Sequence, residues 1–303
     1  MKYIIYNTRY ISYGRTNILL CSDFNIETID IKKYDTPTSI LLILISWYKK
    51  KLDLSKFKFK QAKVVILANT PEEYVFYKEY CTFDCIFANQ NAFINPNAFT
   101  IVNNVEKEYN LVLNARFAVY KCTELAKQVE NVIHIGYYMK NEEYFNDFDN
   151  YNYVNFKNNS KQKTDFTILN TDQLTEYYNK SYVGGIFSKV EGACCASSEY
   201  LLCGIPVVST ESKGGRDIWY NKDNSIICKD NEASVKESVE LAIQKVKNGE
   251  FKKHIIRENY LKQMDEHKSR LAEFLHNLLK QEPYRESIDI ERIKEDLVYY
   301  NVK

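Results

Sequence analysis

Short apolar runs alternate with amphipathic segments through the first hundred residues of the chain. Residues 63–68, KVVILA, form a nearly continuous apolar run, which is typical of a parallel strand covered on both faces. The segment that follows at 71–80 begins Pro-Glu-Glu, a favourable first helical turn. We expect the other strands of this region at 2–7, 27–32 and 84–88, and further helices at 18–24 and 39–52. Repeated strand–helix units predict a doubly wound α/β sheet that binds ligands outside the carboxyl ends of its strands.

The second half of the chain shows the same alternation. Strands are expected at 111–114, 132–137, 153–156 and 205–209, and helices at 118–128, 172–179, 193–203 and 233–280. The turn formers Asn95-Pro96-Asn97 and Asn103-Asn104 indicate a domain boundary just before the first of these strands. We therefore expect one domain over 1–104, a second over 105–285, and a C-terminal helix over 286–303.

Composition narrows the class of protein. The 303 residues suffice for two domains that each have a core, and a net charge of +1 does not suggest a protein that coats nucleic acid. None of the eight cysteines forms a CxxC pair with downstream histidines, so no zinc site is expected. The longest apolar run, 40–48, has about half the length of a membrane span. The apolar run that follows Met1 is too short for the hydrophobic region of a secretory leader. These features favour a cytoplasmic protein with reduced thiols.

The stretch 184–217, GGIFSKVEGACCASSEYLLCGIPVVSTESKGGRD, contains the residues best suited to chemistry. Glu191 is followed by Gly192, which suits a tight turn, and Glu199 comes eight positions after Glu191 on an expected helix. The start of a helix binds phosphate through its unpaired N–H groups. Eight residues span about 12 Å along a helix, roughly the separation of the two sugars of a nucleotide-sugar. Glu199 is then suited to ribose hydroxyls and Glu191 to the transferred sugar; a surface-capping Glu191 and a salt-bridged Glu199 are the alternative.

Two groups of residues in this half resemble the retaining GT-B glycosyltransferases of the group 1 type. The downstream group matches the order and spacing of that family's Glu-x7-Glu signature: Ser188, Glu191-Gly192, Glu199, 204–208 (GIPVV) and Gly214-Gly215. The upstream group is an arginine at the end of a strand and a lysine five residues later, Arg116 and Lys121. The resemblance implies a GT-B fold, with two Rossmann-like doubly wound domains facing a central cleft and a last helix that crosses back to the first domain.

The resemblance also implies a reaction and a site. A sugar would move from a nucleoside-diphosphate sugar to a glycan or lipid-linked acceptor with retention of configuration, without a metal or a further cofactor, in bacterial surface polysaccharide synthesis. The catalytic residues would be Glu191, Arg116 and Lys121. The donor would be bound by Gly192, Ala193, Cys194, Cys195, Ala196 and Glu199, and its base would lie near Leu169 and Asn170.

Polar residues that follow the strands of the first domain are candidates for the acceptor side of the site: Arg9, Gly14, Arg15, Asn69 and Asn89. Asn residues in these positions are also common turn formers and helix caps. Many relatives carry a histidine in this domain, but all four histidines of this chain lie beyond residue 130. We expect Asn69 or Asn89 to supply a neutral hydrogen bond in its place.

A lysine-rich segment adds a prediction about location. Seven lysines surround four apolar residues: Lys49, Lys50, Lys51, Lys56, Lys58, Lys60 and Lys63 around Leu52, Leu54, Phe57 and Phe59. A basic surface that also carries apolar side chains binds anionic membranes, so the enzyme is expected at the inner face of the membrane. A solvated surface edge is the alternative.

Two other function classes stay open. A sugar-nucleotide epimerase of GT-B fold would use the same donor site, but it needs carboxylates or a histidine from the first domain for acid–base catalysis. A catalytically inactive scaffold would bind the nucleotide-sugar without turnover. An acceptor-free assay for sugar inversion distinguishes the first class, and nucleotide binding without turnover of any donor distinguishes the second.

Overall fold

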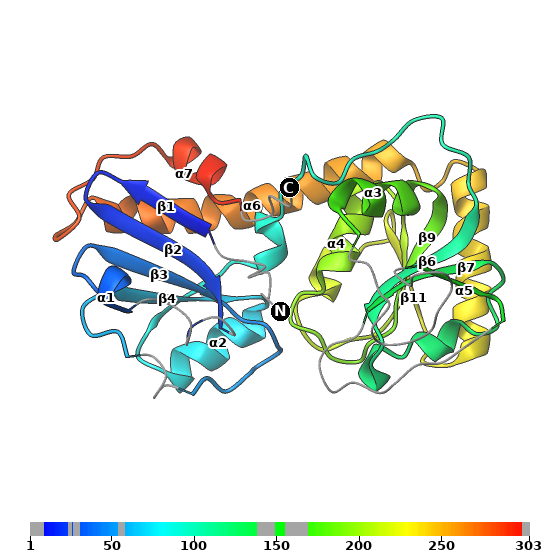
Figure 1. The fold of residues 1–303 in the computed structure, drawn as a ribbon, viewed down its shortest axis with the longest axis horizontal. Helices are drawn as coiled ribbons and strands as arrows, with labels where there is room; N and C mark the ends of the chain where they lie inside the picture. Colours follow the sequence, from blue (N-terminus) through cyan, green and yellow to red (C-terminus); the bar gives the residue numbers. More distant parts are fainter. Residues whose placement is uncertain are drawn as a thin grey trace. The chain divides into compact units, whose positions relative to one another are not determined.

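The computed structural model describes residues 9–23, 26, 31–53, 58–137, 149–154 and 169–298, which fold into two compact α/β units (Figure 1). Unit 1 comprises Met1–Asn95, Glu191–Ala193 and Lys262–Asn301, and unit 2 comprises Pro96–Val190, Cys194–Leu261 and the last two residues. The strand expected at 2–7 and most of the strand expected at 27–32 lie outside the described residues.

Unit 1 is built on a five-stranded sheet in the order β1-β2-β3-β4-β5. Strands β2 to β5 are parallel, and β1 pairs with β2 as an antiparallel edge strand. The strands are β1 (Arg9–Tyr13), β2 (Thr16–Ser22), β3 (Ser39–Leu44), β4 (Lys63–Ala68) and β5 (Asp84–Phe87). The helices described before residue 96 are α1 (Ile31–Tyr34), α2 (Pro71–Tyr80) and the 3₁₀ helix η3 (Gln90–Phe93).

Two segments expected to be helices are strands at the centre of this sheet. Residues 18–22 of the helix expected at 18–24 belong to β2, and the helix expected at 39–52 begins with β3. All six residues of β3 are buried, because β2 and β4 flank it and both of its faces are covered. A short, fully apolar run has no polar face, so its periodicity does not separate a buried strand from a buried helix. Ile40 and Ile43 are β-branched, which favours the strand.

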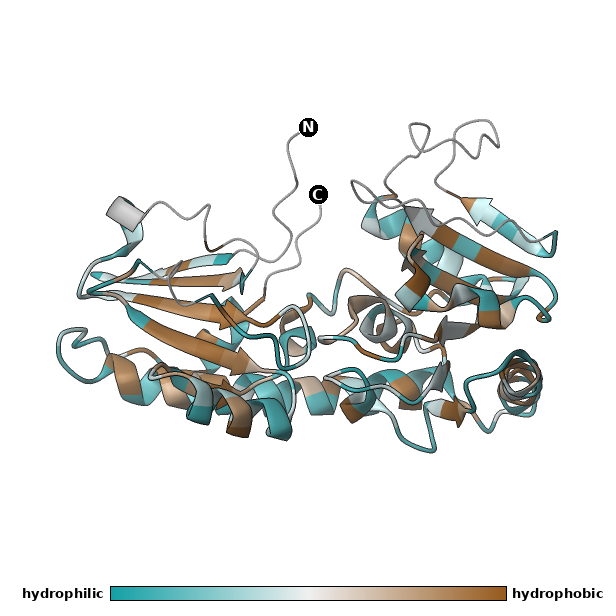
Figure 2. Ribbon diagram, turned by 90° about the horizontal axis from the view of Figure 1, so that it is seen from below, coloured by the Kyte–Doolittle hydropathy of each residue, from teal (hydrophilic) through white to brown (hydrophobic). Residues whose placement is uncertain are grey.

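The strands at 63–68 and 84–87 and the helix at 71–80 are confirmed. Thr70 caps α2, since its side chain accepts a hydrogen bond from the Glu73 N–H at 3.1 Å, and Pro71 occupies the first turn. On one face of the sheet, Tyr77 of α2 packs with Leu41, Ile43 and Ile66 in the core. Most strands of this sheet appear as hydrophobic bands in Figure 2.

Unit 2 is built on a six-stranded, wholly parallel sheet in the order β11-β10-β9-β6-β7-β8. The strands are β6 (Tyr109–Arg116), β7 (Val132–Tyr137), β8 (Tyr151–Val154), β9 (Ser181–Ile186), β10 (Val207–Thr210) and β11 (Ser225–Cys228). The chain runs outward from β6 to β8 and then returns to the other side of β6 through β9. The direction of winding therefore reverses between β6 and β9, which is the switch point where doubly wound sheets bind ligands. The expected doubly wound α/β class is confirmed.

The helices of unit 2 are α3 (Thr171–Asn179), α4 (Cys195–Leu202), α5 (Glu232–Lys247) and the first part of α6 (Lys253–Leu279). The single helical stretch expected over 233–280 is divided at 248–252, where Gly249 adopts φ +74° just after the end of α5. From Lys262 onward α6 belongs to unit 1, as does α7 (Ile290–Asp296), where Asp296 accepts a hydrogen bond from Tyr13 at 3.1 Å. Among the described residues, no helix is both long and apolar enough to cross a membrane.

One expected helix of unit 2 is replaced by two short turns. Residues 118–128 form the 3₁₀ helices η4 (Val119–Lys121) and η5 (Thr123–Ala126) instead of one α-helix. Cys122 between them has φ +50°, a left-handed conformation that interrupts helical hydrogen bonding.

Candidate functional site

The carboxyl edge of the unit 2 sheet brings several of the predicted residues together. Arg116 is the last residue of β6, and Ser188 follows β9, the parallel strand beside β6. The helices α3 and α4 connect successive parallel strands, so α3 begins at the same edge and α4 begins shortly after Ser188. Residue Asn170 caps α3 there through a capping box with Gln173.

The start of α4 has the backbone geometry of an anion site. The N-cap residue Cys194 has φ +57° and makes no side-chain capping hydrogen bond. Its carbonyl accepts from the Ser197 N–H at 3.2 Å, so helical bonding begins at that residue. In a regular helix the N–H groups of the first turn, which here includes Ala196, have no intrahelical acceptor. This arrangement, together with the helix dipole, favours a bound phosphate.

Glu199 lies one turn further along α4 and is buried. Its Oε2 accepts a hydrogen bond from the Tyr178 hydroxyl at 2.6 Å and a longer one from the Asn114 side-chain amide at 3.4 Å. Burial raises the pKa of this carboxyl to about 7, while the two hydrogen bonds act in the opposite direction. Among the described residues Glu199 makes no ion pair, so the salt-bridged alternative is not what holds it.

Tyrosines from α3 and α4 hold this carboxylate in place. The rings of Tyr178 and Tyr200 meet edge to face with centroids 5.0 Å apart, and the Tyr200 hydroxyl accepts from the Asn114 N–H at 2.7 Å. A side chain at Gly184 of β9 would overlap the Tyr200 ring, so glycine is needed there for the close packing of α4 on β9. Sequence reasoning missed Asn114 and Tyr178; the position of Asn114 at the end of the expected strand LVLN was the signal available.

Arg116 and Lys121 lie close to one another through a shared tyrosine. The Nε of Arg116 donates to the Tyr120 hydroxyl at 2.5 Å, and its guanidinium carbon lies 4.9 Å from the centroid of that ring. The Lys121 ammonium lies 5.1 Å from the same centroid. Two cations therefore gather around one aromatic ring at the end of β6, and both are suited to the charge of a diphosphate.

A buried arginine organises the loops that follow β9 and β10. The side chain of Arg216 is fully buried and donates to the Ser188 carbonyl at 2.9 Å, the Thr210 carbonyl at 2.5 Å and the Asp217 carboxylate at 2.7 Å. Asp217 in turn accepts from the Ser212 N–H at 2.9 Å. Sequence reasoning assigned no role to Arg216, although it follows the Gly214-Gly215 pair of the family signature.

The glycine loop is also attached to the first turn of α4. Gly214 has φ +116°, which only glycine adopts readily, and the loop closes at the short 3₁₀ helix η7 (Asp217–Trp219). The Tyr220 hydroxyl and the Ser197 hydroxyl lie 2.7 Å apart and share a hydrogen bond. A backbone bridge pairs Val190 with Lys213 on the other side of the loop. The loops around the start of α4 are thus fixed by side-chain and backbone contacts within unit 2.

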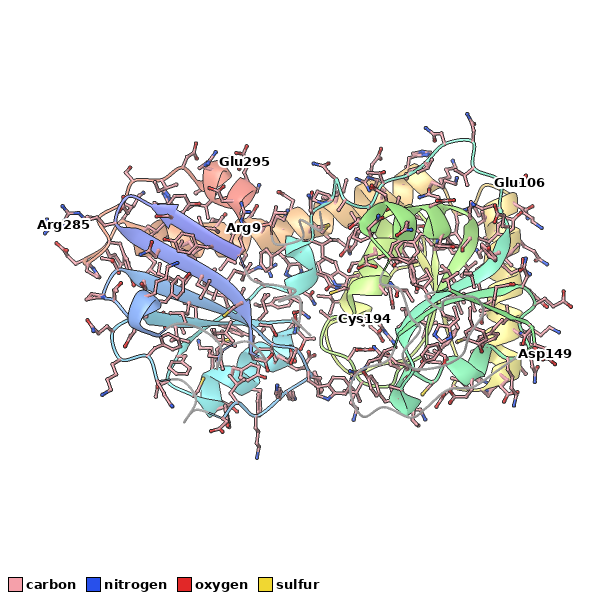
Figure 3. The ribbon with its side chains drawn as sticks, in the orientation of Figure 1. Arg9, Glu106, Asp149, Cys194, Arg285 and Glu295 are labelled. Carbon is pink, nitrogen blue, oxygen red and sulfur yellow. The ribbon has the colours of Figure 1, made fainter. Side chains whose placement is uncertain are left out.

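The predicted run of donor-binding residues is divided between the two units. Glu191, Gly192 and Ala193 belong to unit 1, whereas Cys194, Cys195 and Ala196 belong to unit 2. Glu191 is 5% exposed and Ala193 is 1% exposed. Cys194, which is labelled in Figure 3, is the first residue of the segment Cys194–Leu261 of unit 2. No comparable division is visible in the sequence, where 191–196 form one continuous motif.

The predicted acceptor residues at the carboxyl edge of unit 1 are Asn69, Asn89 and Arg9. Asn69 follows β4 and Asn89 follows β5, and both are fully buried. Arg9 starts the antiparallel strand β1 opposite Leu20, near the end of β2. Its Nε is buried and has no hydrogen-bond acceptor among the described residues. The roles of these residues toward an acceptor stay predictions.

Gly14 and Arg15 lie at the opposite edge of the sheet from the one expected. They form the tight turn between β1 and β2, where Gly14 has φ +55°, and so they lie at the amino ends of the parallel strands. The backbone N–H of Arg15 donates to Glu286 at 2.9 Å. The expectation failed because β1 is antiparallel to β2, so the residues that follow β1 lie at the amino ends of the parallel strands.

Unit 1 does contain histidines, because α6 folds with it. The Nδ1 of His267 accepts from the Asn89 N–H at 3.3 Å and lies 3.3 Å from the Arg270 guanidinium, which also donates to the Phe87 carbonyl. Two donors at Nδ1 require the tautomer with its proton on Nε2. Burial and the Arg270 charge lower the pKa of His267 to about 4. The expectation of a histidine-free first domain is correct for the first 130 residues but not for the folded unit.

The lysine-rich segment does not present its apolar residues as a surface. Leu52 is 5% exposed within the unit 1 core, and Phe59 packs against that core. Lys50 forms an ion pair with the buried Asp23 at 2.6 Å, and Lys63 pairs with Asp84 at 2.7 Å. Leu54, Lys56 and Phe57 lie outside the described residues. The described part of this segment gives no support to contact with a membrane.

The chain is similar to glycosyltransferases both in sequence and in fold. Residues 119–262 match the model of the family described as glycosyl transferases group 1. Sucrose-phosphate synthase from Thermosynechococcus elongatus has a similar structure, with a TM-score of 0.57 at 12% identity over 80% of this chain and 68% of that one. TarM, from S. aureus, has a TM-score of 0.57 at 12% identity over 84% of this chain and 57% of its own.

HepE from Anabaena, solved with UDP, has a TM-score of 0.55 at 11% identity over 79% of this chain and 72% of that one. No curated protein matches the chain by sequence. The fold is that of the GT-B glycosyltransferases, which these solved structures share. The residues that match the group 1 family model, 119–262, make up most of unit 2.

Proposed function

We propose that the protein is a retaining, metal-independent glycosyltransferase that uses a nucleoside-diphosphate sugar. The observation that carries the proposal is the set of groups at the carboxyl edge of unit 2, at the switch point of its sheet. Arg116 and Lys121 supply two cations around Tyr120, α4 supplies a helix start, and Glu199 supplies a carboxylate one turn away. A diphosphate joined to a ribose matches this order of groups.

The proposed mechanism depends on stabilising the negative charge that develops on the leaving diphosphate. As the bond between the sugar and the diphosphate breaks, negative charge gathers on the departing phosphate, and Arg116, Lys121 and the α4 amides stabilise it. The acceptor hydroxyl attacks the anomeric carbon from the same face, and its proton passes to the departing phosphate. Glu199 holds the ribose hydroxyls, and Glu191 orients the sugar hydroxyls without forming a covalent bond. Configuration at the anomeric carbon is therefore retained.

UDP-sugars are the first donors to test. HepE was solved with UDP and with UDP and glucose, and TarM with UDP; each has a TM-score above 0.5 against this chain. We propose a glycan or lipid-linked acceptor, in bacterial surface polysaccharide synthesis within the cytoplasm. This part of the proposal is supported by the family of unit 2 alone.

A thermal-shift screen against UDP-, GDP-, ADP- and CMP-sugars tests the donor site, because a ligand that binds the native state raises the melting temperature. We expect one base to stand out, followed by transfer to a glycan acceptor that persists in EDTA. Failure of every nucleotide-sugar to bind overturns the proposal. Inversion of the sugar without an acceptor indicates an epimerase instead, and binding without turnover indicates a scaffold. His267 does not favour the epimerase, since its Nδ1 is occupied and its pKa is about 4.

A further inference from the structure

Three buried asparagines connect the carboxyl ends of β4 and β5 to residues 191–193, which we call the Glu191 turn. Asn91 is the second residue of η3, and its side-chain amide donates to the Ala193 carbonyl at 2.7 Å. Asn91 is itself held by Asn89, whose Oδ1 accepts the Asn91 N–H at 2.9 Å. Asn89 then donates to the Asn69 carbonyl at 3.0 Å.

The other end of this network is anchored in the sheet and in α6. The Asn69 side chain donates to the Ile45 carbonyl at 2.8 Å and accepts from the Gln90 N–H at 3.1 Å. The Asn89 N–H donates to His267 of α6 at 3.3 Å. The network therefore joins the ends of β3, β4 and β5 with α6. All three asparagines are fully buried, so none of these groups exchanges its partner for water at the surface.

The Glu191 turn has a second contact with the rest of unit 1, after the hydrogen bond from Asn91. A Cβ atom on Gly192 would overlap the carbonyl group of Ser46, the second residue after β3. The backbone of Gly192 thus packs directly on the backbone of Ser46, while Asn91 holds the next residue by its carbonyl. Two contacts on adjacent residues fix the direction of the segment that carries Glu191.

We infer that Asn91 is a positioning residue for sugar transfer: by holding Ala193, it sets the orientation of the Glu191 carboxylate toward the transferred sugar. The inference rests on the proposed function of Glu191. It also gives Asn69 and Asn89 a role different from contact with an acceptor, because both side-chain amides are used to hold Asn91 and its neighbours. Small displacements of a group that orients substrate lower turnover by large factors, roughly a hundredfold per ångström.

The test combines hydrogen exchange with kinetics on the full chain. In Asn91→Ala, the amides of 191–194 should exchange faster than in the wild type, and kcat should fall roughly tenfold or more. Affinity for UDP, or for the nucleoside diphosphate that the donor screen identifies, should stay within about twofold, since Arg116, Lys121 and α4 are untouched. Asn91→Asp keeps the shape of the side chain and serves as a second variant if the alanine protein does not fold.

Asn179→Ala is the matched control. Asn179 is equally buried and donates to the Thr100 and Thr175 carbonyls at 2.9 and 2.8 Å in unit 2, whereas Glu191, Gly192 and Ala193 belong to unit 1. This variant should lose stability without faster exchange at 191–194 and without a lower kcat. Unchanged exchange at 191–194 in both Asn91 variants overturns the inference, as does faster exchange with unchanged kcat. A wild-type protein that transfers no sugar would overturn the proposed function instead, and the exchange measurement alone would then decide whether Asn91 anchors the turn.

Discussion

The Tyr120 hydroxyl accepts a hydrogen bond from the Nε of Arg116 at 2.5 Å, and the two residues are only four positions apart at the end of β6. The same ring faces the Lys121 ammonium at 5.1 Å. Tyr120 therefore keeps two like charges near each other before any anion is bound. A hydrogen bond and two cation–π contacts offset part of the repulsion between the two cations.

Tyr120→Phe should weaken binding of the nucleoside diphosphate roughly three- to tenfold, because it removes the acceptor of the Arg116 hydrogen bond but keeps the ring. Tyr120→Leu should weaken it further, since both cation–π contacts are lost. Isothermal titration calorimetry measures each affinity. Tyr109→Phe is the control, because Tyr109 begins β6 at the amino edge of the sheet. Equal affinities for the wild type and Tyr120→Leu would show that the tyrosine does not organise the cations.

Lys121→Ala and Glu191→Ala should both abolish transfer without unfolding the protein, but for different reasons. The lysine variant should lose affinity for the nucleoside diphosphate, because a charge that matches the phosphate is removed. The glutamate variant should keep this affinity, since Glu191 is assigned to the transferred sugar. Calorimetry and a transfer assay separate the two effects. Lys127→Ala removes a lysine that pairs with Glu232 at 2.5 Å and should retain activity. Substantial transfer by Glu191→Ala would remove that residue from the mechanism.

Helices and strands that are determined by neighbouring residues could be predicted from short sequence patterns. The strand at 63–68 and the helix at 71–80 have an apolar run, a cap and a proline in the correct places, and the structure has both. The Glu199 helix was likewise visible from its apolar residues and the glycine that follows it, although it is three residues shorter than expected. Periodicity failed at 39–44 because the central strand of a sheet is apolar on both faces.

The remaining features depend on contacts between distant residues, which one sequence does not show. The assignment of His267 to unit 1 requires knowing that α6 folds with both units. The position of Gly14 and Arg15 depends on β1 being antiparallel to β2. The role of Arg216 depends on two carbonyls, Ser188 and Thr210, that come from different strand ends. Residue types at these positions are compatible with ordinary loops, so their function appears only when the loops are packed.

Arg216→Lys should destabilise the protein and disrupt the donor site. Lysine presents a single point charge and does not reach the Ser188 carbonyl, the Thr210 carbonyl and Asp217 at once, as the planar guanidinium does. We expect a loss of about 2–4 kcal/mol in the free energy of unfolding, because buried carbonyls lose their donors. Urea unfolding measures this change, and calorimetry measures affinity for the nucleoside diphosphate. Arg285→Lys, an exposed arginine that pairs with Glu282, is the control. A lysine variant as stable as the wild type would contradict this account of Arg216.

Glu199→Gln should make the protein more stable at pH 8 and a weaker binder of the donor. Burial raises the pKa of Glu199 from 4.5 to about 7, so the native state binds more protons than the unfolded state between these values. The stability that this group contributes is therefore present at low pH and is lost as the pH rises from about 4.5 to 7. Above that range, ionised Glu199 costs roughly 3 kcal/mol, which the neutral glutamine avoids.

The measurement is urea unfolding of both proteins at pH 5.5 and pH 8, where the advantage of the glutamine variant should grow by roughly 1–3 kcal/mol at the higher pH. The difference between the two proteins cancels the contribution of Glu73, whose pKa burial also raises to about 7. Donor affinity of the wild type should increase with pH through 7, because the ionised carboxylate is the better acceptor for ribose hydroxyls; the variant should lose this dependence. An equal stability difference at both pH values would mean that Glu199 is ionised in the native protein at pH 5.5 as well, and that its hydrogen bonds to Tyr178 and Asn114 outweigh its burial.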